Sequence, residues 1–391
     1  MRALSLTILL FLAACRNDSS TKLHQVSTAL SGEAFLWTVP LNMPLPKLNP
    51  DNPMSEAKFQ LGRHLFYDKN LSGNGTLSCS SCHQQDKAFT DGRTVAIGST
   101  GQSHPRNAQA LVNVAYYASL TWANTSLVSV EQQVFIPLFG ENPIEHGITQ
   151  DNWPMVVARL EAEPRYTALF AAAFPSETPV FTQEYITKAL AVFVKGLTSF
   201  NSAYDRHLSG DNTQYGASEQ RGQSLFFGEK MECFHCHGGY NFSDSTADRT
   251  MTFVNRPFHN TGLYNIDGSG KFPAPNRGLF EATGKTSDMG RFRAPTLRNI
   301  AKTAPYMHDG SVKDLSAVVD FYAAGGRNIE TGELHGDGRK NPFKDGFVTG
   351  FVVSEQEKKD LISFLESLTD ESFLTNPRFS NPWDLRGSSS R

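Results

Sequence analysis

Two copies of a Cys-x-x-Cys-His motif constrain most strongly what this chain can fold into. They occupy residues 79–83 and 233–237. Each copy offers two thiols that can bond to the vinyl groups of a haem, and then an imidazole that can ligate the iron. Zinc held by two Cys-x-x-Cys pairs is the alternative, but it gives no reason for a histidine after both pairs. The motifs therefore predict two covalently bound haem c groups, attached through Cys79, Cys82, His83, Cys233, Cys236 and His237.

The first fifteen residues indicate export. Arg2 gives a positive start, residues 3–14 form an apolar run, and small residues precede Cys15. This run is too short to span a bilayer. Because the residues before Cys15 resemble a bacterial lipobox, we expect residues 1–15 to be a signal peptide of the lipoprotein type, with an ordinary cleaved signal as the alternative. The expected location is the periplasm, where a lipid on Cys15 would anchor the protein to the outer membrane.

The net charge and the use of the cysteines argue against a nucleic-acid-binding protein and against a disulfide-bonded fold. The net charge is -3 and no run of Lys and Arg stands out, so a nucleic-acid partner is not expected. Of the 5 cysteines, Cys15 belongs to the signal and the other four to the two motifs. No cysteine therefore remains for a structural disulfide.

A weak internal repeat surrounds the two motifs. A Ser-Glu pair at 55–56 leads to Gly-x-x-Leu-Phe at 62–66 and then to Cys79, and a second pair at 218–219 leads to the same pattern at 222–226 and then to Cys233. Each copy predicts a short amphipathic helix before a haem-attachment turn, as at the start of a cytochrome c domain. A polar break near 209–218 then predicts haem domains at 16–210 and 211–386, and residues 387–391 read as a flexible tail or cloning scar.

The remaining pattern is helical. Apolar periodicity predicts helices over 153–174, 183–208 and 312–324. A capping box at Ser354 and Glu357 begins a last helix through Leu365. Long strand patterns are missing, and residues 241–298 predict a long loop held by a cofactor. The expected fold is all-α, with two cytochrome c-like haem domains and long loops.

Several further motifs resemble those of the di-haem cytochrome c peroxidase and MauG family across nearly the whole mature chain. They are LSGNG at 71–75, FTDGR at 89–93, RNA at 106–108, EQ at 131–132, NPIE at 142–145, APTLRN at 294–299 and APYMHDG at 304–310. The run CFHCHGGYNF at 233–242 resembles the MbnH branch, which is found with methanobactin systems and Trp-containing partner proteins.

The resemblance implies the iron ligands. His83 and His237 bind the two irons, and in many members a Met fourteen residues after the His of a Tyr-x-His-Asp-Gly motif binds the second iron as well. The same count from His308 reaches Tyr322, which matches the MauG pattern. An anionic phenolate lowers the haem potential relative to Met. Packing on a helix face is the alternative role of Tyr322, and a structural role is expected for His308.

The first iron is expected to be open. Many members carry a His after Gly98 that blocks this iron, whereas here Ser99 follows. His104, directly before Pro105, is the alternative ligand. The resemblance therefore implies a five-coordinate iron on His83 that can bind peroxide.

The family pattern also implies catalytic residues. Glu145 matches the acid that moves a proton during peroxide cleavage. Gln132 matches the distal Gln, with Gln133 as the alternative because an insertion blurs the count. Trp122 matches the indole that relays electrons between the haems, although Ala-Asn-Thr follows it in place of the usual Asp-Gly-Arg.

A calcium site is expected between the haems. Asn107 would bind the ion through its side chain, and Thr303 and Pro305 through their backbone carbonyls, a set of oxygen ligands that suits calcium. A turn is the alternative role of Asn107. The histidines without a motif are expected on the surface or in packing roles: His24, His64, His146, His207, His235, His259 and His335.

These resemblances imply an oxidoreductase. Hydrogen peroxide would react at the His83 haem, the oxidising equivalents would spread over both haems through Trp122 as a high-valent state, and a Trp or Tyr of a periplasmic or surface partner protein would be oxidised. One alternative is a peroxidase that reduces peroxide with electrons from a small cytochrome or cupredoxin, against which Tyr322 argues. The other is a non-catalytic electron-transfer module, against which the missing blocking His argues.

Overall fold

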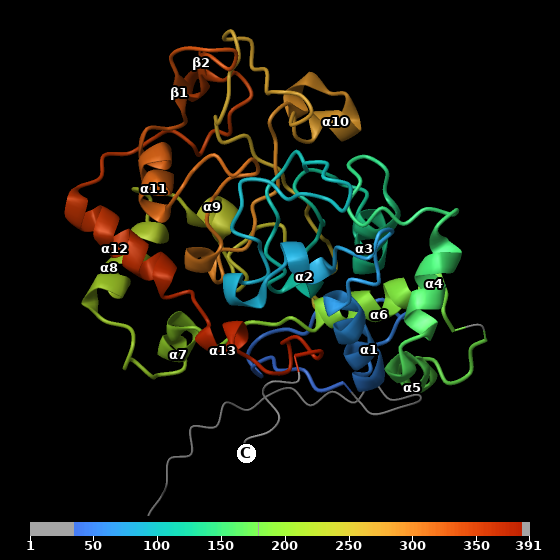
Figure 1. Cartoon of the computed structure of the whole chain (residues 1–391). Helices are drawn as coiled ribbons and strands as arrows, with labels where there is room; N and C mark the ends of the chain where they lie inside the picture. The colour runs from blue at the N-terminus through green and yellow to red at the C-terminus, as the bar shows by residue number, and fades with distance from the viewer. Residues whose placement is uncertain (1–34, 179, 385–391) are drawn as a thin grey trace, which may run out of the picture.

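The computed structural model describes residues 35–178 and 180–384 of the chain (Figure 1). The predicted signal segment with Cys15 and the tail at 387–391 lie outside these ranges. Within the described ranges, no helix is both long and apolar enough to cross a membrane.

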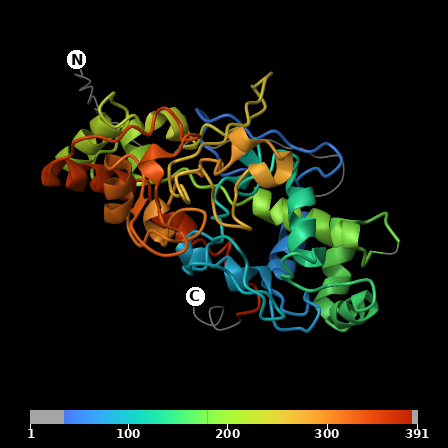
Figure 2. The same ribbon diagram turned by 90° about the horizontal axis from the view of Figure 1, so that it is seen from above.

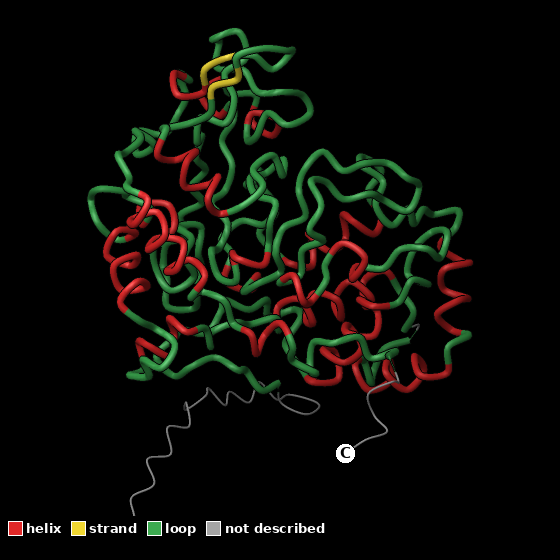
Figure 3. Tube along the Cα trace, turned by 60° about the vertical axis from the view of Figure 1, so that its left-hand side comes forward, coloured by secondary structure: helices red, strands yellow, loops and turns green. Residues whose placement is uncertain are grey.

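Short helices separated by long loops make up the structure (Figure 3). The helices of the first half are α1 (Glu56–Tyr67), α2 (Cys79–Cys82), α3 (Val130–Phe139), α4 (Trp153–Glu161), α5 (Pro164–Ala173), α6 (Gln183–Lys195) and α7 (Ala203–Leu208). Those of the second half are α8 (Ala217–Phe226), α9 (Phe234–His237), α10 (Phe280–Thr283), α11 (Leu315–Ala323), α12 (Glu355–Glu366) and α13 (Glu371–Leu374). Short 3₁₀ turns lie at Gln85–Lys87, Val114–Tyr116, Thr286–Asp288, Ile300–Lys302 and Gly338–Lys340. The strands β1 (Asn328–Ile329) and β2 (Gly336–Asp337) pair antiparallel. The fold is mostly helical, as expected.

The sequence repeat corresponds to a repeated helix pair. Helix α1 packs on α6, and α8 packs on α12. The repeated glycine lies at each crossing. A Cβ at Gly62 would come within 2.0 Å of the Ala189 carbonyl oxygen, and a Cβ at Gly222 within 1.9 Å of the Asp360 carbonyl oxygen. Only glycine lets the two backbones approach this closely. The sequence repeat therefore corresponds to two similar helix crossings, one before each attachment motif.

The hydrophobic side chains of the described residues form separate clusters. The first draws on α1, α3, α4, α5 and α6, and the second on α8, α11 and α12. The green helices α4 and α5 lie on one side of the molecule, and the orange and red helices α11 and α12 lie on the other (Figure 1, Figure 2). However, Phe373, Leu374 and Phe379 pack in the first cluster. The segment from Phe373 to Phe379 therefore packs on the first half of the chain, although a division at residue 210 would assign it to the second domain.

Two predicted helices are interrupted. The helix predicted over 153–174 ends at Glu161, and α5 begins at Pro164, because a proline fits the first turn of a helix but not its interior. The helix predicted over 183–208 ends at Lys195, and Ser202 caps a new helix, α7. The capping box of Ser354 and Glu357 is present at the start of α12.

Candidate functional site

The first attachment motif lines a cavity. Cys79, Cys82 and His83 form part of its wall, and the cavity encloses about 460 Å³ free of protein atoms, part of it open to solvent. The Nδ1 atom of His83 lies 2.7 Å from the carbonyl oxygen of Phe89. This contact fixes the ring and leaves Nε2 as the atom that can ligate a metal. Neither Cys79 nor Cys82 forms a disulfide with a described residue.

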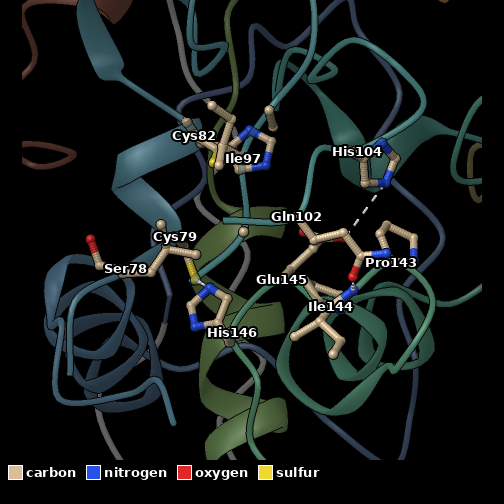
Figure 4. A pocket seen from close by; sticks show the side chains of 15 residues that line it. Ser78, Cys79, Cys82, Ile97, Gln102, His104, Pro143, Ile144, Glu145 and His146 are labelled. Carbon is tan, nitrogen blue, oxygen red and sulfur yellow. Dashed lines mark hydrogen bonds and ion pairs between the residues drawn. The ribbon is translucent and has the colours of Figure 1, made fainter. Parts of the chain in front are cut away.

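A second wall of this cavity carries the predicted acid. Pro143, Ile144 and Glu145 line it together with Gly98 and Gln102 (Figure 4). The loop that lacks a blocking His is tied to this segment. The Ser99 backbone N–H donates to the Glu145 carbonyl oxygen at 2.7 Å, and the Ile144 N–H donates to the Gln102 side chain at 2.9 Å. Glu145 is therefore held at the cavity by backbone contacts.

Glu145 and His104 face each other beside the cavity. Their Oε1 and Nε2 atoms are 3.6 Å apart, and their side chains are 32% and 29% exposed (Figure 4). The Nδ1 atom of His104 lies 3.1 Å from the backbone N and O atoms of Arg106, which holds the ring in this orientation. Burial raises the pKa of Glu145 to about 7 and lowers the pKa of His104, because it disfavours the charged form of each group. A carboxyl group with such a pKa can both give and take a proton near neutral pH.

Gln132 and Gln133 of α3 are the two candidates for the distal amide. Gln132 is exposed, so its side chain is not placed in the cavity. Gln133 lies one helical turn before Pro137, which lines the cavity. The Oε1 atom of Gln133 is buried and has no hydrogen-bond partner in the described part of the chain. Neither amide is among the residues that line the cavity, so the choice between Gln132 and its alternative Gln133 stays a prediction.

His146 also belongs to the first cavity. It is buried and lines the wall, with Nδ1 2.6 Å from the Leu71 carbonyl oxygen and Nε2 3.9 Å from the sulfur of Cys79. Burial lowers its pKa to about 4, so the ring is neutral at physiological pH. We had expected a surface or packing role, and no motif spacing pointed to this position.

The second attachment motif lines a larger cavity, which encloses about 1370 Å³ free of protein atoms, part of it open to solvent. Cys233, Cys236 and His237 lie on its wall, and Tyr322 of α11 lines it too. The Nδ1 atom of His237 lies 3.1 Å from the Pro295 carbonyl oxygen. The Tyr322 hydroxyl makes no hydrogen bond to any described residue, and burial raises its pKa. The structure thus brings the predicted ligand pair to one cavity.

His308 supplies an orphaned polar atom in the second cavity. Its ring lines the wall and stacks on Phe292, with centroids 3.6 Å apart. Its Nε2 atom is buried and has no partner among the described residues. Burial lowers the pKa of His308 to about 3. A buried nitrogen without a partner is costly, so this site fits a bound group that carries an acceptor, as a haem does in its propionates.

Trp122 joins the two halves. It lines the second cavity, and its indole N–H donates to the Asn107 carbonyl oxygen at 2.9 Å. The Asn107 backbone N–H in turn donates to the His308 carbonyl oxygen at 2.8 Å, and its side-chain amide donates to the Arg93 carbonyl oxygen at 2.7 Å. Trp122 therefore keeps a polar support, although the residues after it differ from the family pattern.

The predicted calcium ligands present unused oxygens. The side-chain oxygen of Asn107 and the backbone carbonyls of Thr303 and Pro305 accept no hydrogen bond from the described residues. Asn107 is buried and bonded to His308, three residues beyond Pro305. Oxygen acceptors of this kind suit a hard cation. The residues present therefore fit calcium.

The sequence did not predict that His259 lies at the second cavity. It lines the second cavity, and each of its ring nitrogens lies 2.7 Å from a carboxylate oxygen, one of Asp244 and one of Asp345. It stands in a stretch without motif spacing, and its two partners are far apart in the sequence, so no local signal marked it.

Comparisons with known proteins agree with this geometry. Residues 56–213 match the family described as di-haem cytochrome c peroxidase. The chain is 35% identical over 334 residues to the methylamine utilization protein MauG of Methylorubrum extorquens, covering 85% of this chain and 83% of that protein. It is 33% identical over 362 residues to the cytochrome-c peroxidase IdrP1 of Denitromonas iodatirespirans, covering 88% of this chain and 90% of that one.

A solved structure is also similar. It is described as a MauG-like protein associated with microbial copper homeostasis, and it superposes with a TM-score of 0.88 at 53% identity, covering 90% of this chain and 100% of that chain. This likeness extends over both cavities. The chain therefore belongs to the di-haem cytochrome c peroxidase and MauG family, and it is a haem-dependent oxidoreductase of the peroxidase type.

Proposed function

We propose that this protein uses hydrogen peroxide to oxidise a Trp or Tyr of a partner protein. The haems, when bound, supply the iron that reacts with peroxide and the redox centres that hold the oxidising equivalents. Each is proposed to be a haem c attached through the two cysteines of its motif, with His83 and His237 as the iron ligands. Asn107, Thr303 and Pro305 are proposed to hold calcium between them.

Glu145 is the proton carrier of the first cavity. Cleaving a peroxide O–O bond requires a proton to move from the inner oxygen to the leaving oxygen. Glu145 lines the cavity beside the attachment motif, and its pKa of about 7 suits both steps. His104, 3.6 Å away and partly exposed, is placed to exchange this proton with solvent. Gln133 would orient the bound peroxide from α3.

Trp122 provides the route between the two cavities. Its indole lines the second cavity, and its hydrogen bond runs to Asn107, which also contacts the first half through Arg93. An indole can pass an oxidising equivalent from one half to the other. Asn107 is buried, so the acceptor of this hydrogen bond is held within the protein.

The observation that carries the proposal is Tyr322 in the wall of the second cavity, together with His237. A phenolate stabilises a higher charge on iron than a thioether does. The second cavity is thus suited to storing an oxidising equivalent rather than to accepting an electron from a donor. The similar solved structure is associated with microbial copper homeostasis. We therefore propose that the partner is a periplasmic protein of copper homeostasis.

The test uses the purified ferric holoprotein without any reductant. Peroxide is added in equimolar amount, and the Soret band is followed by stopped-flow absorbance. We expect the Soret absorbance of both haems to change directly after mixing, because Ser99 cannot block the first iron. A candidate partner, encoded beside this gene, is then added and analysed by mass spectrometry for an oxidised Trp or Tyr. A protein that stays silent until one haem is reduced would refute the proposal.

The alternative is a peroxidase that draws electrons from a small cytochrome or cupredoxin. Its support is the similarity to IdrP1, which is named a cytochrome-c peroxidase. It predicts rapid steady-state peroxide consumption with reduced cytochrome c as the donor. It also predicts no change in the mass of a Trp-bearing partner.

A further inference from the structure

A histidine held between two carboxylates lies at the rim of the second cavity. The His259 Nε2 atom is 2.7 Å from Asp244 Oδ2, and its Nδ1 atom is 2.7 Å from Asp345 Oδ2. The three side chains are 15%, 21% and 22% exposed, in the order His259, Asp244 and Asp345. We call these three residues the His259 clamp.

The backbone around the clamp is fixed. His259 and Phe292 exchange two backbone hydrogen bonds, of 2.8 and 2.9 Å. The Asp345 N–H donates to the Asn260 carbonyl oxygen at 2.8 Å, and the Asp244 N–H donates to the Cys236 carbonyl oxygen at 2.9 Å. His259 is therefore a fixed part of the cavity wall, and backbone hydrogen bonds fix the two carboxylate-bearing residues that contact it.

The two carboxylates require a charged imidazole. A neutral ring has one N–H and can donate to one carboxylate only, whereas the imidazolium donates from both nitrogens. Burial lowers the pKa of His259, but the hydrogen bond with Asp244 and further contacts outweigh it and raise the pKa to about 11. Part of this rise comes from Cys236, and a thioether would remove that part. The hydrogen bonds to Asp244 and Asp345 remain.

The clamp lies against the attachment point of the second haem. The ligand atoms of Cys236, Asp244 and His259 are within 4.8 Å of one another. His259 lines the same cavity as His237 and Tyr322. The other side chains of the wall that are charged at neutral pH are Glu232 and Arg293.

We propose that the His259 clamp sets the reduction potential of the second haem. The clamp holds one positive and two negative charges, so its net charge is negative, and the charge of His259 opposes those of its two carboxylates. A charge this close to a redox centre in a low-dielectric wall shifts the potential, because it changes the relative stability of the ferric and ferrous forms. His259 is thus a positioning residue that keeps the potential above the value that Asp244 and Asp345 alone would impose. The proposal rests on haem binding in this cavity but not on the peroxide reaction.

The test compares two substitutions with opposite signs. His259→Gln removes the positive charge and should lower the midpoint potential of the second haem, whereas Asp345→Asn removes a negative charge and should raise it. His335→Gln is the matched control, because His335 is an exposed histidine 3.5 Å from Asp267 and lines neither of the two cavities. In the His335→Gln variant, the midpoint potential of the second haem should equal that of the wild type.

The measurement is a spectroelectrochemical titration of each purified holoprotein, without peroxide or partner. The second haem is recognised by its His and Tyr ligation, and the first haem serves as an internal reference. The proposal is overturned if His259→Gln matches the His335→Gln control, or if both clamp variants shift the potential in the same direction. If His259→Gln does not retain haem, Asp345→Asn alone decides, and an unchanged potential then overturns the proposal. Because no turnover is measured, failure of the peroxide chemistry would leave this result unaffected.

Discussion

Replacing Glu145 by Gln should have opposite effects on catalysis and on stability. The variant loses the proton carrier but keeps a similar shape, so peroxide cleavage should slow by about 10²- to 10⁴-fold. The stability effect follows from the pKa, which burial raises from 4.5 to about 7. A shift of that size corresponds to roughly 3 kcal/mol at 1.36 kcal/mol per unit. Because the side chain is 32% exposed, solvent screening reduces this to about 1–2 kcal/mol.

The sign of the stability effect depends on pH. The folded pKa of Glu145 lies above the unfolded value, so the folded state holds its proton more tightly, and stability is lost as the pH rises through about 7. Glutamine carries no charge at any pH. The variant should therefore match the wild type at pH 4 and exceed it by about 1–2 kcal/mol at pH 8.

The assay has two parts. Stopped-flow absorbance gives the rate of the peroxide reaction, and urea denaturation at pH 4 and pH 8 gives the free energy of unfolding. Glu141→Gln is the control, because Glu141 is exposed and lies four residues before Glu145. A peroxide rate within about threefold of the wild type would move the proton carrier elsewhere. An equal stability difference at both pH values would show that Glu145 is not buried as described.

Three further predictions concern the ligand, the relay and the scaffold. Tyr322→His should abolish the His/Tyr low-spin signal in electron paramagnetic resonance while both haems stay attached, and an unchanged spectrum would assign the ligand elsewhere. Trp122→Phe should leave the peroxide response of the first haem intact but remove that of the second, as followed by stopped-flow absorbance. Gly62→Ala should destabilise the fold by about 1–3 kcal/mol or more, because its Cβ would lie 2.0 Å from the Ala189 carbonyl oxygen. The same substitution at Gly346, where no atom lies within 4 Å, should change the urea midpoint little.

The sequence predicted those parts of the site that depend on local chemistry. A Cys-x-x-Cys-His motif fixes its own geometry within one turn of chain, so both cavities could be located in advance. The spacing from His308 to Tyr322 also predicted that Tyr322 lies near the second attachment motif, because the segment between them is a short turn and a capped helix. The capping box at Ser354 is of the same kind, since both of its residues lie within one turn.

Residues whose roles depend on distant contacts could not be predicted. The choice between Gln132 and Gln133 depends on the register of α3, because a shift of one residue moves a side chain about 100° around a helix. Asp244 and Asp345 stabilise the protonated form of His259, and no sequence pattern connects these three residues. The return of Phe373 to the first cluster depends on packing in the assembled fold.

The two halves share a scaffold but differ in the chemistry of their cavities. A glycine at the α1–α6 crossing and another at the α8–α12 crossing allow the same close approach of two backbones in each half. The first cavity carries Glu145, an acid with a pKa near neutrality, whereas the second carries Tyr322 and an unpaired nitrogen on His308. Proton transfer needs a group that changes its charge, and storage of an oxidising equivalent needs a donor that stabilises charge. We therefore propose that the two cavities, built next to similar helix crossings, divide the reaction between them through the different side chains on their walls.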